Sequence, residues 1–537
     1  MKNNSNSVLL KFVGVLLFMA LTSCNSDSAR SNNIKNDSFW DTKDGKAIYS
    51  QGGGIFKFTH PKTGQEKYFW YGVHYKQAET YREDPSSTKQ GNSFEGVSCY
   101  SSADLVNWEF EANVLTPEEV FGGSQRRWGW LGRMGVAYVK EANQYVLIIQ
   151  YNSSVLFAVA DSPLGPFKKQ HAKNMKSWIG TPNTGDQTVF TDEDSGKSYL
   201  VYSYGQGRNK IYLSEIGLKN DTITLLDFKQ VFRGAGREGN CMFKYRGKYY
   251  LAASQLYGWD GSLAYYLVAD DIMGPYLPEN DMQVIPGVED DYAHISQTGF
   301  FVTVRGSKQE TVIFCGDRWA DFAGNGLGYN QWCPLSFDGD LPYFNSLNSW
   351  NLNAKTGEWE VADDNNWVKN ASFEADRKQM PSPVKPVQTR LLGWETEVIK
   401  GIEISLDSLS PILNHANTEE ERKIVIGERS LNMSDRVDFV RKVSQKISSS
   451  PYVIFPNASY TLTARIKNSG GFNKLEMYAE SGGKRYAVKV KEENETWTSI
   501  SIEKLKVKNN ELEIGFFAEG QAGAFCLVDD VSLLKAK

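Results

Sequence analysis

Short runs of tyrosine and β-branched residues, separated by polar turn residues, recur between Ile48 and Leu341. Each run is short enough to form the central strand of a small antiparallel sheet. The five runs lie at residues 68–72, 145–149, 199–203, 249–254 and 311–315. Their spacing is irregular, about fifty to eighty residues, which favours blades arranged around an axis over a solenoid.

Most of these runs are followed by a partner strand that ends at Asp or Ser and then at Trp or Gly-Pro. Such strands lie at residues 99–108, 158–166 and 268–275. No stretch of this region has the long amphipathic period of a helix, so an α/β barrel is disfavoured. The pattern predicts an all-β fold with a five-bladed β-propeller over residues 45–345, and a double-sheet sandwich is the alternative.

The composition changes after Gly357, where strongly alternating strands such as residues 460–465 and 511–517 follow. Alternation of this kind is typical of half-buried strands in a sandwich. We therefore expect a linker at residues 346–365 and a β-sandwich (jelly-roll) domain at residues 366–537. The domain resembles modules appended to glycan-active enzymes, and that resemblance implies a structural calcium ion at Glu374 and at Asp529 or Asp530.

The N-terminus has the features of a bacterial targeting segment. The apolar run at residues 12–21 follows Lys2 and Lys11 and is too short for a permanent membrane span. It ends in Leu21-Thr22-Ser23-Cys24, which resembles a lipobox, so residues 1–24 are predicted to be a lipoprotein signal peptide with lipidation at Cys24. Residues 25–44 are read as a flexible tether, and the protein is placed in the bacterial cell envelope, with membrane contact only through its lipid. An ordinary cleaved signal peptide is the alternative.

The bulk composition excludes several classes of partner. The 537 residues carry a formal net charge of −5 without a basic block, so nucleic acid is not expected as a partner. Aromatic residues make up 13% of the chain, which suits both a β-rich core and stacking on sugars. The five cysteines other than Cys24 have no C-x-x-C spacing and are read as buried thiols without a metal cluster, although one disulfide stays open.

Two of the repeated units carry a carboxylate at the same place. Glu238 opens the unit that continues into residues 249–254, and Asp186 opens the unit that continues into residues 199–203. Equivalent strands of neighbouring blades meet around one axis, so the two carboxylates could converge on one site. The alternative for each is a structural ion pair, with Arg237 as the cation.

These motifs resemble glycoside hydrolase family 43, a family of inverting enzymes with a five-bladed propeller. The resemblance spans residues 45–345, and its most specific parts are Arg237-Glu238, residues 184–186 and residues 316–319. Residues 51–55, 70–72 and 96–108 are most similar to the exo-β-1,3-galactanase-like branch. The resemblance implies Glu238 as general acid and Asp186 as the carboxylate that orients it and raises its pKa.

The sequence departs from the family at two positions. Most members carry an aspartate as base on the first strand, where this chain has Gln51-Gly52-Gly53-Gly54; in the galactanase-like branch a later glutamine has been proposed to handle the water, and Gln297 matches it. The usual Glu-Arg-Pro triplet is replaced by Gly132-Arg133-Met134, with Glu95 as a substitute carboxylate in a predicted loop. This second departure leaves α-L-arabinofuranosyl and β-galactofuranosyl ends open as substrates.

The predicted activity is removal of terminal sugars from a plant-type glycan such as arabinogalactan by an inverting glycosidase that requires no cofactor. The alternative is a non-catalytic glycan-binding surface lipoprotein. Catalysis is assigned to Glu238, Asp186 and Gln297. Substrate binding is assigned to a larger set of polar and aromatic residues: Gln51, His74, Glu95, Arg133, Trp259, His294, Arg318 and Trp319.

Overall fold

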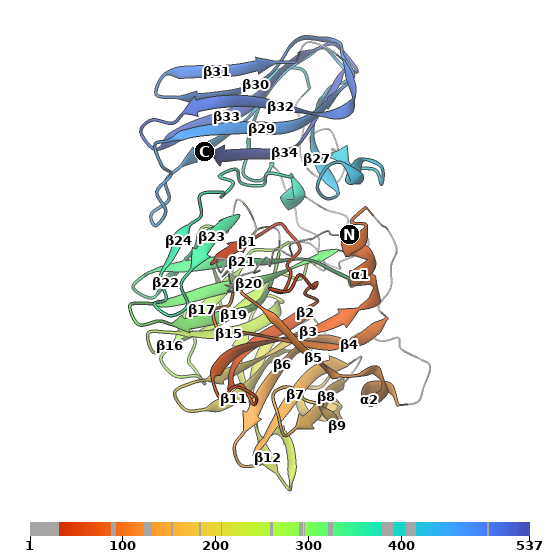
Figure 1. Cartoon of the computed structure of the whole chain (residues 1–537), viewed down its shortest axis with the longest axis vertical. Helices are drawn as coiled ribbons and strands as arrows, with labels where there is room; N and C mark the ends of the chain where they lie inside the picture. Colours follow the sequence, from red (N-terminus) through yellow and green to blue (C-terminus); the bar gives the residue numbers. More distant parts are fainter. Residues whose placement is uncertain are drawn as a thin grey trace, which may run out of the picture. The chain divides into compact units, whose positions relative to one another are not determined.

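The computed structural model of the chain describes residues 32–86, 93–122, 131–151, 154–181, 184–205, 207–257, 261–288, 291, 294, 296–320, 326–376, 391–402, 415–490 and 493–536. Side chains at residues 319, 320 and 326–329 are not among the features described. Strands dominate these parts of the chain (Figure 1).

Five antiparallel sheets follow one another between Gln51 and Phe344, and in each the strands pair in chain order. Blade 1 contains β2 (Gln51–Thr59), β3 (Glu66–Tyr75), β4 (Phe94–Ser102) and β5 (Glu109–Leu115); blade 2 contains β6 (Leu131–Val139), β7 (Gln144–Tyr151), β8 (Ser154–Ala160) and β9 (Lys168–Lys173); blade 3 contains β10 (Gln187–Asp192), β11 (Lys197–Ser203), β12 (Lys210–Lys219) and β13 (Thr222–Leu225), with β14 (Lys229–Arg233) also on β12; blade 4 contains β15 (Glu238–Tyr245), β16 (Lys248–Ser254), β17 (Tyr265–Ala269) and β18 (Gln283–Val284); blade 5 contains β19 (Gln297–Arg305), β20 (Glu310–Ala320), β21 (Gly326–Asp338) and β22 (Leu341–Phe344).

The first strand of every blade lies at the centre of the propeller. β2 packs against β6, β6 against β10, β10 against β15, β15 against β19 and β19 against β2, which closes a ring. The five aromatic runs of the sequence form the second strands β3, β7, β11, β16 and β20. The prediction of a five-bladed propeller is confirmed.

Each described blade is built from consecutive strands and shares none with its neighbour. Tryptophan side chains pack at the seam between blades 1 and 5. The ring centroids of Trp70 and Trp332 are 5.1 Å apart, and Trp108 lies 5.1 Å from Trp70. Trp40 adds an edge contact to Trp332 at 4.8 Å. Trp70, Trp108 and Trp332 are buried, so the seam is held by packed aromatic rings.

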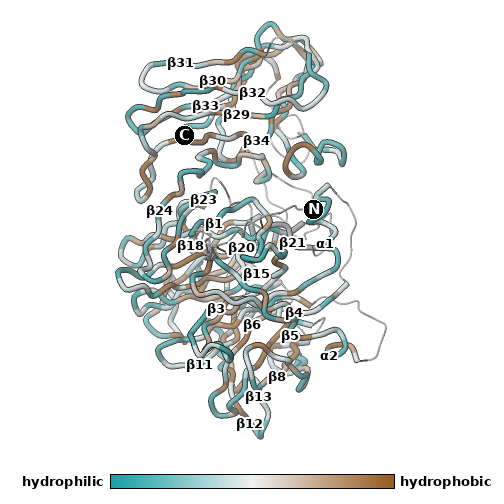
Figure 2. Tube along the Cα trace, viewed as in Figure 1, coloured by the Kyte–Doolittle hydropathy of each residue, from teal (hydrophilic) through white to brown (hydrophobic). Residues whose placement is uncertain are grey.

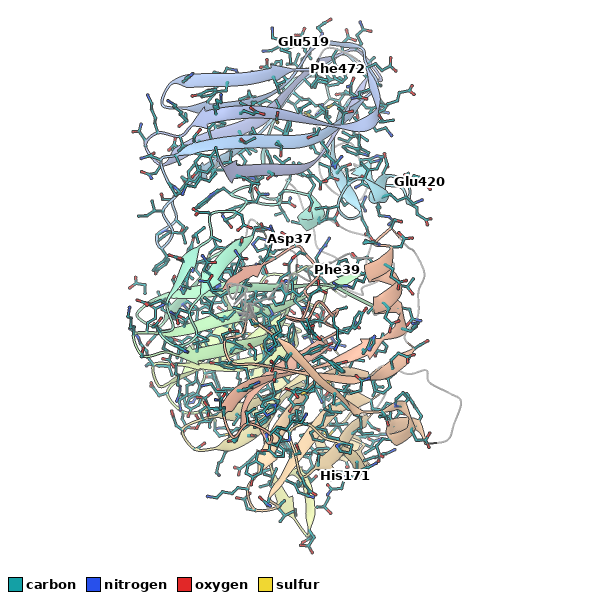
Figure 3. The ribbon with its side chains drawn as sticks, viewed as in Figure 1. Asp37, Phe39, His171, Glu420, Phe472 and Glu519 are labelled. Atoms are coloured by element: carbon teal, nitrogen blue, oxygen red, sulfur yellow. The ribbon has the colours of Figure 1, made fainter. Side chains whose placement is uncertain are left out.

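The segment before the propeller is folded, so the prediction of a flexible tether over residues 25–44 is wrong for its described part. β1 (Asn33–Lys35) pairs with β23, and Ile34 and Asn36 are buried. The Asn36 amide donates to the carbonyls of Trp332 and Leu347 and accepts from the Trp332 N–H. Asp37 and Phe39 of this segment are labelled in Figure 3. Polar composition suggested a tether, but these polar groups pair with backbone.

The predicted linker is folded as well. Residues 346–365 contain β23 (Ser349–Leu352) and β24 (Trp359–Val361), which form a three-stranded sheet with β1. Trp350 is fully buried and its indole N–H donates to the Trp332 carbonyl. The linker therefore belongs to the tryptophan seam.

The C-terminal domain is a sandwich of two five-stranded antiparallel sheets. Burial alternates strictly along β29 (Ser459–Asn468), and Figure 2 shows hydrophobic and hydrophilic segments mixed through the strands of this domain. One sheet has the order β25 (Glu395–Lys400), β28 (Phe439–Ser448), β33 (Glu511–Gly520), β30 (Phe472–Ser481), β31 (Lys484–Lys489), and the other β26 (His415–Ala416), β27 (Arg429–Ser434), β34 (Phe525–Lys535), β29 (Ser459–Asn468), β32 (Asn494–Lys506). The predicted sandwich is confirmed.

Helices are short in the described parts of the chain. They are α1 (Lys76–Glu83), α2 (Pro117–Phe121) and α3 (Lys176–Ile179), with 3-10 turns at Glu374–Asp376 and Glu421–Lys423. None of the described helices is long and apolar enough to cross a membrane. Cys99, Cys241, Cys315, Cys333 and Cys526 are buried free thiols, as predicted, and no disulfide joins them.

Candidate active site

The predicted catalytic residues meet where the central strands begin. Glu238 is the first residue of β15, Gln297 is the first of β19, and Asp186 immediately precedes β10. The backbone at Asp186 is left-handed, with φ of 67°, a conformation that costs free energy and is often found at functional sites. The repeat of the sequence therefore places these side chains at one end of the propeller axis.

Glu238 is buried, at 6% exposure, and both of its carboxyl oxygens have nitrogen partners. The Gln297 amide donates to Glu238 Oε1 over 2.7 Å, and the Arg208 guanidinium donates to Oε2. Burial and the charge of Asp186 raise the pKa of Glu238 to about 8, while Arg208, Arg133 and the Gln297 hydrogen bond act in the opposite direction. A carboxyl group with this pKa carries a proton near neutral pH, as a general acid must.

Asp186 is the charged partner of Glu238. Burial would raise its pKa, but the guanidinium groups of Arg208 and Arg133 hold the pKa below its ordinary value. Its Oδ2 atom accepts from the Gly239 N–H over 3.0 Å and lies 3.7 Å from Arg133 Nε. Two carboxyl groups whose environments move their pKa values apart are the usual basis for dividing acid and charge-stabilising roles.

Arg133, which the sequence predicted to bind substrate, lies beneath Gln297 and joins two side chains of the site. Its guanidinium donates to Gln297 Oε1 over 2.7 Å and to Asp317 Oδ2 over 2.6 Å. The side chain is only 1% exposed. Because the guanidinium holds both Gln297 and Asp317, we assign Arg133 a positioning role in place of the predicted contact with substrate.

Asp317 lies in residues 316–319, one of the motifs that carry the family resemblance, but no role was predicted for it. It is buried on β20, and burial raises the pKa of its carboxyl against the opposing charge of Arg133. Its neighbour Arg318 was predicted to bind substrate, but Arg318 Nη2 lies 3.5 Å from Glu374 Oε2. Successive residues of a strand point to opposite faces, so only one of the two can reach the axis.

The cation beside the acid is Arg208, in the loop between β11 and β12, and no sequence pattern pointed to it. Arg208 Nη1 contacts Glu238 Oε2 and lies 3.8 Å from Asp186 Oδ1. Arg237, named above as the cation of an alternative ion pair, lies with its guanidinium 4.1 Å from the Tyr265 ring centroid and donates to Gln255. A separation of thirty residues in sequence hid the Arg208 contact.

Gln297 is in contact with the acid in this arrangement. A base across the sugar ring would lie about 6.5–9.5 Å from the acid, whereas the Gln297 amide nitrogen lies 2.7 Å from Glu238 Oε1. Its oxygen accepts from Arg133. Both ends of the amide are therefore occupied, and a water-handling role requires the Gln297–Glu238 hydrogen bond to open when sugar enters.

Gln51 opens the stretch that lacks the aspartate expected from the family resemblance. It is 2% exposed at the start of β2, and neither its amide nitrogen nor its amide oxygen has a hydrogen-bond partner among the described residues. A buried unpaired amide is costly and suits a polar ligand. Glu95 is half-buried within β4, so its assignment to a loop is corrected.

Two histidines predicted to bind substrate are held by other groups. His74 Nε2 lies 2.9 Å from Glu79 Oε1, and the imidazole stacks on Tyr49 with centroids 4.2 Å apart. His294 Nδ1 lies 3.6 Å from Asp37 Oδ2 and 3.7 Å from Asp291 Oδ2. Neither imidazole contacts Glu238 or Asp186 in these ion pairs, and sugar binding by the two histidines stays a prediction.

Three further predictions concern residues or side chains that the structure does not describe. Trp259 and Cys24 lie outside the described residues, and the side chain of Trp319 is not among those described.

The carboxylates predicted to hold calcium lie near one another but have other partners. Glu374 Oε1 accepts from the Arg429 N–H, Asp529 Oδ1 from the Asp530 N–H and Asp530 Oδ1 from the Ile426 N–H. Burial and neighbouring carboxylates raise the pKa of Asp529, a cost that a bound cation would relieve. Within the described parts of the chain, no three His, Cys, Asp or Glu residues form a group that could hold a metal. The calcium ion stays a prediction.

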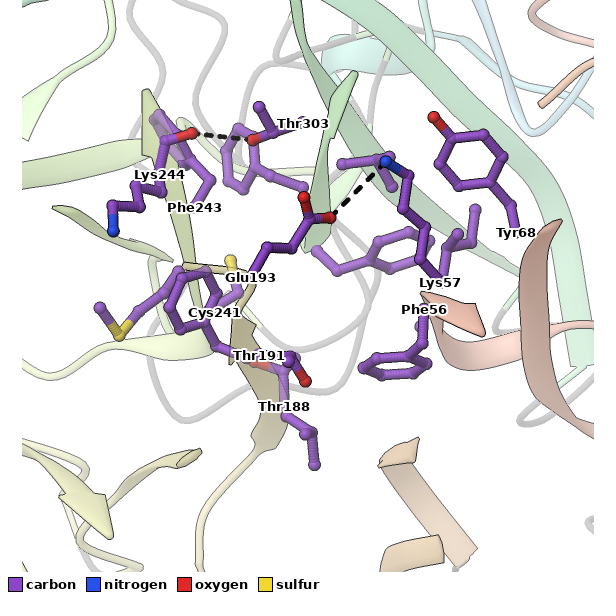
Figure 4. A pocket seen from close by; sticks show the side chains of 18 of the residues that line it. Phe56, Lys57, Tyr68, Thr188, Thr191, Glu193, Cys241, Phe243, Lys244 and Thr303 are labelled. Carbon is purple, nitrogen blue, oxygen red and sulfur yellow. Dashed lines mark hydrogen bonds and ion pairs between the residues drawn. The ribbon is translucent and has the colours of Figure 1, made fainter. Parts of the chain in front are cut away.

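A cavity of about 120 Å³ lies between the later residues of the central strands. Its walls are mainly apolar, with Phe56 and Phe243 among them, and Lys57 lies 3.8 Å from Glu193 (Figure 4). Glu238, Asp186 and Gln297 are not among its lining residues. The cavity is separate from the acid site, and its one described acidic group, Glu193, is paired with a cation.

The site matches a known family of enzymes. The model of glycosyl hydrolases family 43 matches residues 76–328. The propeller of this chain belongs to glycoside hydrolase family 43. The family match confirms the resemblance, and with the acid pair at the axis it makes the protein an inverting glycosidase.

Solved structures of similar fold cover the propeller and the sandwich together. The exo-β-1,3-galactanase from Phanerochaete chrysosporium with β-1,3-galactotriose is 21% identical, with a TM-score of 0.52 over 94% of this chain and 100% of that one. The exo-β-1,3-galactanase from Clostridium thermocellum is 19% identical, with a TM-score of 0.52 over the same shares. At these identities the likeness shows the two-domain fold. No curated protein matches the sequence.

Proposed function

We propose that this family 43 glycosidase releases galactose from the ends of β-1,3-linked galactan chains. The observation that carries the proposal is the pairing of Glu238 with Gln297 on an axis that has Gln51, and no carboxylate, on its first strand. This departure from most of the family is shared with the galactanase-like branch. The names of the similar structures, exo-β-1,3-galactanases, support the same sugar and linkage.

In the proposed reaction Glu238 donates its proton to the glycosidic oxygen as the bond to the sugar breaks. Asp186 stays ionised and keeps the pKa of Glu238 high enough for it to hold that proton. Gln297 orients the water that attacks from the opposite face once the entering sugar has separated it from Glu238. Attack by this water in a single step inverts the anomeric carbon, and the proton that the water loses passes to solvent.

A furanoside is the second candidate substrate. Gly132 stands where related enzymes place a glutamate that grips the sugar, and Arg133 beside it faces Gln297 and Asp317. A pocket without that carboxylate could take an α-L-arabinofuranosyl or β-galactofuranosyl end.

We also propose that Cys24 is lipidated in the bacterial envelope and that the sandwich holds calcium at Glu374 and at Asp529 or Asp530.

The test is digestion of linear β-1,3-galactan, arabinogalactan and synthetic furanosides by protein lacking residues 1–24, with chromatography of the released monosaccharides. Release of galactose from the linear chain is the expected result. Release of arabinose, or release of galactose from the synthetic galactofuranoside but not from the linear galactan, would replace the galactan assignment with the furanoside one. Binding of these glycans without release of any sugar, equal in the parent and in Glu238→Ala, would support the non-catalytic alternative.

A further inference from the structure

Arg208 differs from the other partners of Glu238 in its exposure. Its side chain is 28% exposed, whereas Gln297 is 5% exposed and Arg133 is 1% exposed. It lies in the loop between β11 and β12 with a left-handed backbone at φ of 44°. Among the described partners, Arg208 is therefore the one that can move without opening the core.

The position of the Arg208 guanidinium conflicts with acid catalysis. A general acid must lie within about 2.6–3.2 Å of the atom that it protonates. Glu238 Oε1 faces the buried Gln297 amide and Oε2 faces the more exposed Arg208 side chain, so a glycosidic oxygen approaches from the side of Oε2. Oε2 is in contact with Arg208 Nη1. A guanidinium has five N–H donors and no acceptor, so it cannot receive the proton of Glu238.

We propose that the departing sugar displaces Arg208 from Glu238, and that Arg208 then binds hydroxyl groups of that sugar and so determines which leaving groups the enzyme accepts. The ligand class is a neutral, hydroxyl-bearing sugar. The ligand needs no negative charge, because the displaced guanidinium can stay paired with Asp186. Asp186 Oδ1 lies 3.8 Å away and is ionised. The inference rests on the glycosidase activity and not on which sugar is released.

Displacement has an electrostatic consequence at the acid. The charged groups that face Glu238 are Asp186, Arg208 and Arg133, while Asp317 pairs with Arg133 behind them. Arg208 lowers the pKa of Glu238 in the free site. When Arg208 leaves, the pKa of Glu238 rises, so the acid keeps its proton to higher pH in the complex than in the free enzyme.

Kinetics on a cleaved oligosaccharide test this directly, because kcat/KM reports the free enzyme and kcat the complex. In the parent, the alkaline limb of kcat is expected at higher pH than that of kcat/KM. In Arg208→Gln the alkaline limb of kcat/KM should move to higher pH until it coincides with that of kcat. Arg208→Lys should restore part of the pH difference between the two limbs. Arg233→Ala removes an exposed arginine of the same blade as a control. The proposal would be overturned if the alkaline limbs of kcat and kcat/KM coincide in the parent and Arg208→Gln does not move either limb.

Leaving-group dependence separates the sugar contact from the charge effect. Arg208→Gln should reduce kcat/KM for the oligosaccharide at least tenfold more than for an aryl glycoside of the same sugar, since the aryl group offers no hydroxyls to bind. Equal losses on both substrates would overturn the role in leaving-group selection.

A measurement without turnover keeps the inference testable if the proposed galactan activity fails. Glu238 has a raised pKa in the folded protein, so its ionisation costs stability as pH rises from its unfolded value near 4.5. The free energy of unfolding of Glu238→Gln, relative to that of the parent, therefore increases with pH until the pH passes the folded pKa of Glu238, near 8. In the Arg208→Gln background this gain should continue to higher pH. An unchanged profile would overturn the electrostatic role of Arg208 whatever the substrate is.

Discussion

Gln297 donates its side-chain amide to the carboxyl group of Glu238 over 2.7 Å. Because Arg133 donates to the amide oxygen of Gln297, the amide has one orientation, with nitrogen toward the acid. An amide nitrogen in this form donates and does not accept a proton. Water activation by Gln297 therefore needs substrate to separate the pair, and this requirement can be tested.

Replacement of Gln297 by alanine should lower kcat roughly a hundredfold or more, the usual cost of losing proton-transfer assistance. The space left would admit a small nucleophile, so azide should restore turnover and yield a glycosyl azide of inverted configuration. Product analysis by NMR checks the configuration. Turnover close to the parent in Gln297→Ala would refute the water-handling role.

Replacement of Glu238 by glutamine should reduce hydrolysis of a natural glycan by roughly 10²–10⁴-fold, since the leaving sugar then departs unprotonated. A dinitrophenyl glycoside, whose leaving group needs no proton, should lose far less. Glu215→Gln is a suitable control, because Glu215 forms a surface ion pair with Lys197 at 3.0 Å. Equal losses on both substrates would argue against Glu238 as the acid.

Neutralising Asp186 should move the alkaline limb of kcat/KM to lower pH. The negative charge of Asp186 helps to raise the pKa of Glu238 to about 8, so Asp186→Asn lets Glu238 lose its proton earlier. The activity at pH 8 should then fall more than the activity at pH 6. A pH profile of kcat/KM on one substrate measures the change, and a limb that moves upward would contradict the assigned sign.

The acid pair was predictable from sequence because a repeated unit marks it. Glu238 and Asp186 open equivalent strands, so periodicity alone places them together at the axis. Asp317 and Arg208 carry no such mark: Asp317 is 184 residues from Arg133, and Arg208 lies in a loop whose course depends on the fold. Arg318 was assigned to the wrong face because the pattern did not say which residue of β20 points inward.

The ends of the propeller were mispredicted for a different reason. Residues 32–44 and 346–365 are polar in composition, which usually indicates chain without a fold. In the structure Asn36 and Trp350 are buried against backbone and rings of the seam, a context that composition does not reveal. Local polarity predicted flexibility where tertiary hydrogen bonds supply order.

Arg133 should be among the most destabilising positions to change. Arg133→Met would leave Asp317 buried and unpaired, which costs about 3–5 kcal/mol for a broken buried ion pair. The double change Arg133→Met with Asp317→Asn removes the stranded charge and should recover part of that loss. Urea unfolding of the three variants measures the coupling, and strict additivity of the two single changes would show that the residues do not act as a pair.

Asn36 should hold the seam between blades 1 and 5 closed. Its side chain is 1% exposed and satisfies the backbone N–H and C=O of Trp332 together with the Leu347 carbonyl. Asn36→Ala leaves these buried groups without this partner, so the free energy of unfolding should fall by about 1–3 kcal/mol. Ser38→Ala, which removes an exposed hydroxyl bonded to the Lys35 carbonyl, should change it by less than about 0.5 kcal/mol. Thermal and urea unfolding of both variants checks the difference. Equal stabilities would mean that the tryptophan rings close the seam unaided and that the N-terminal segment only covers it.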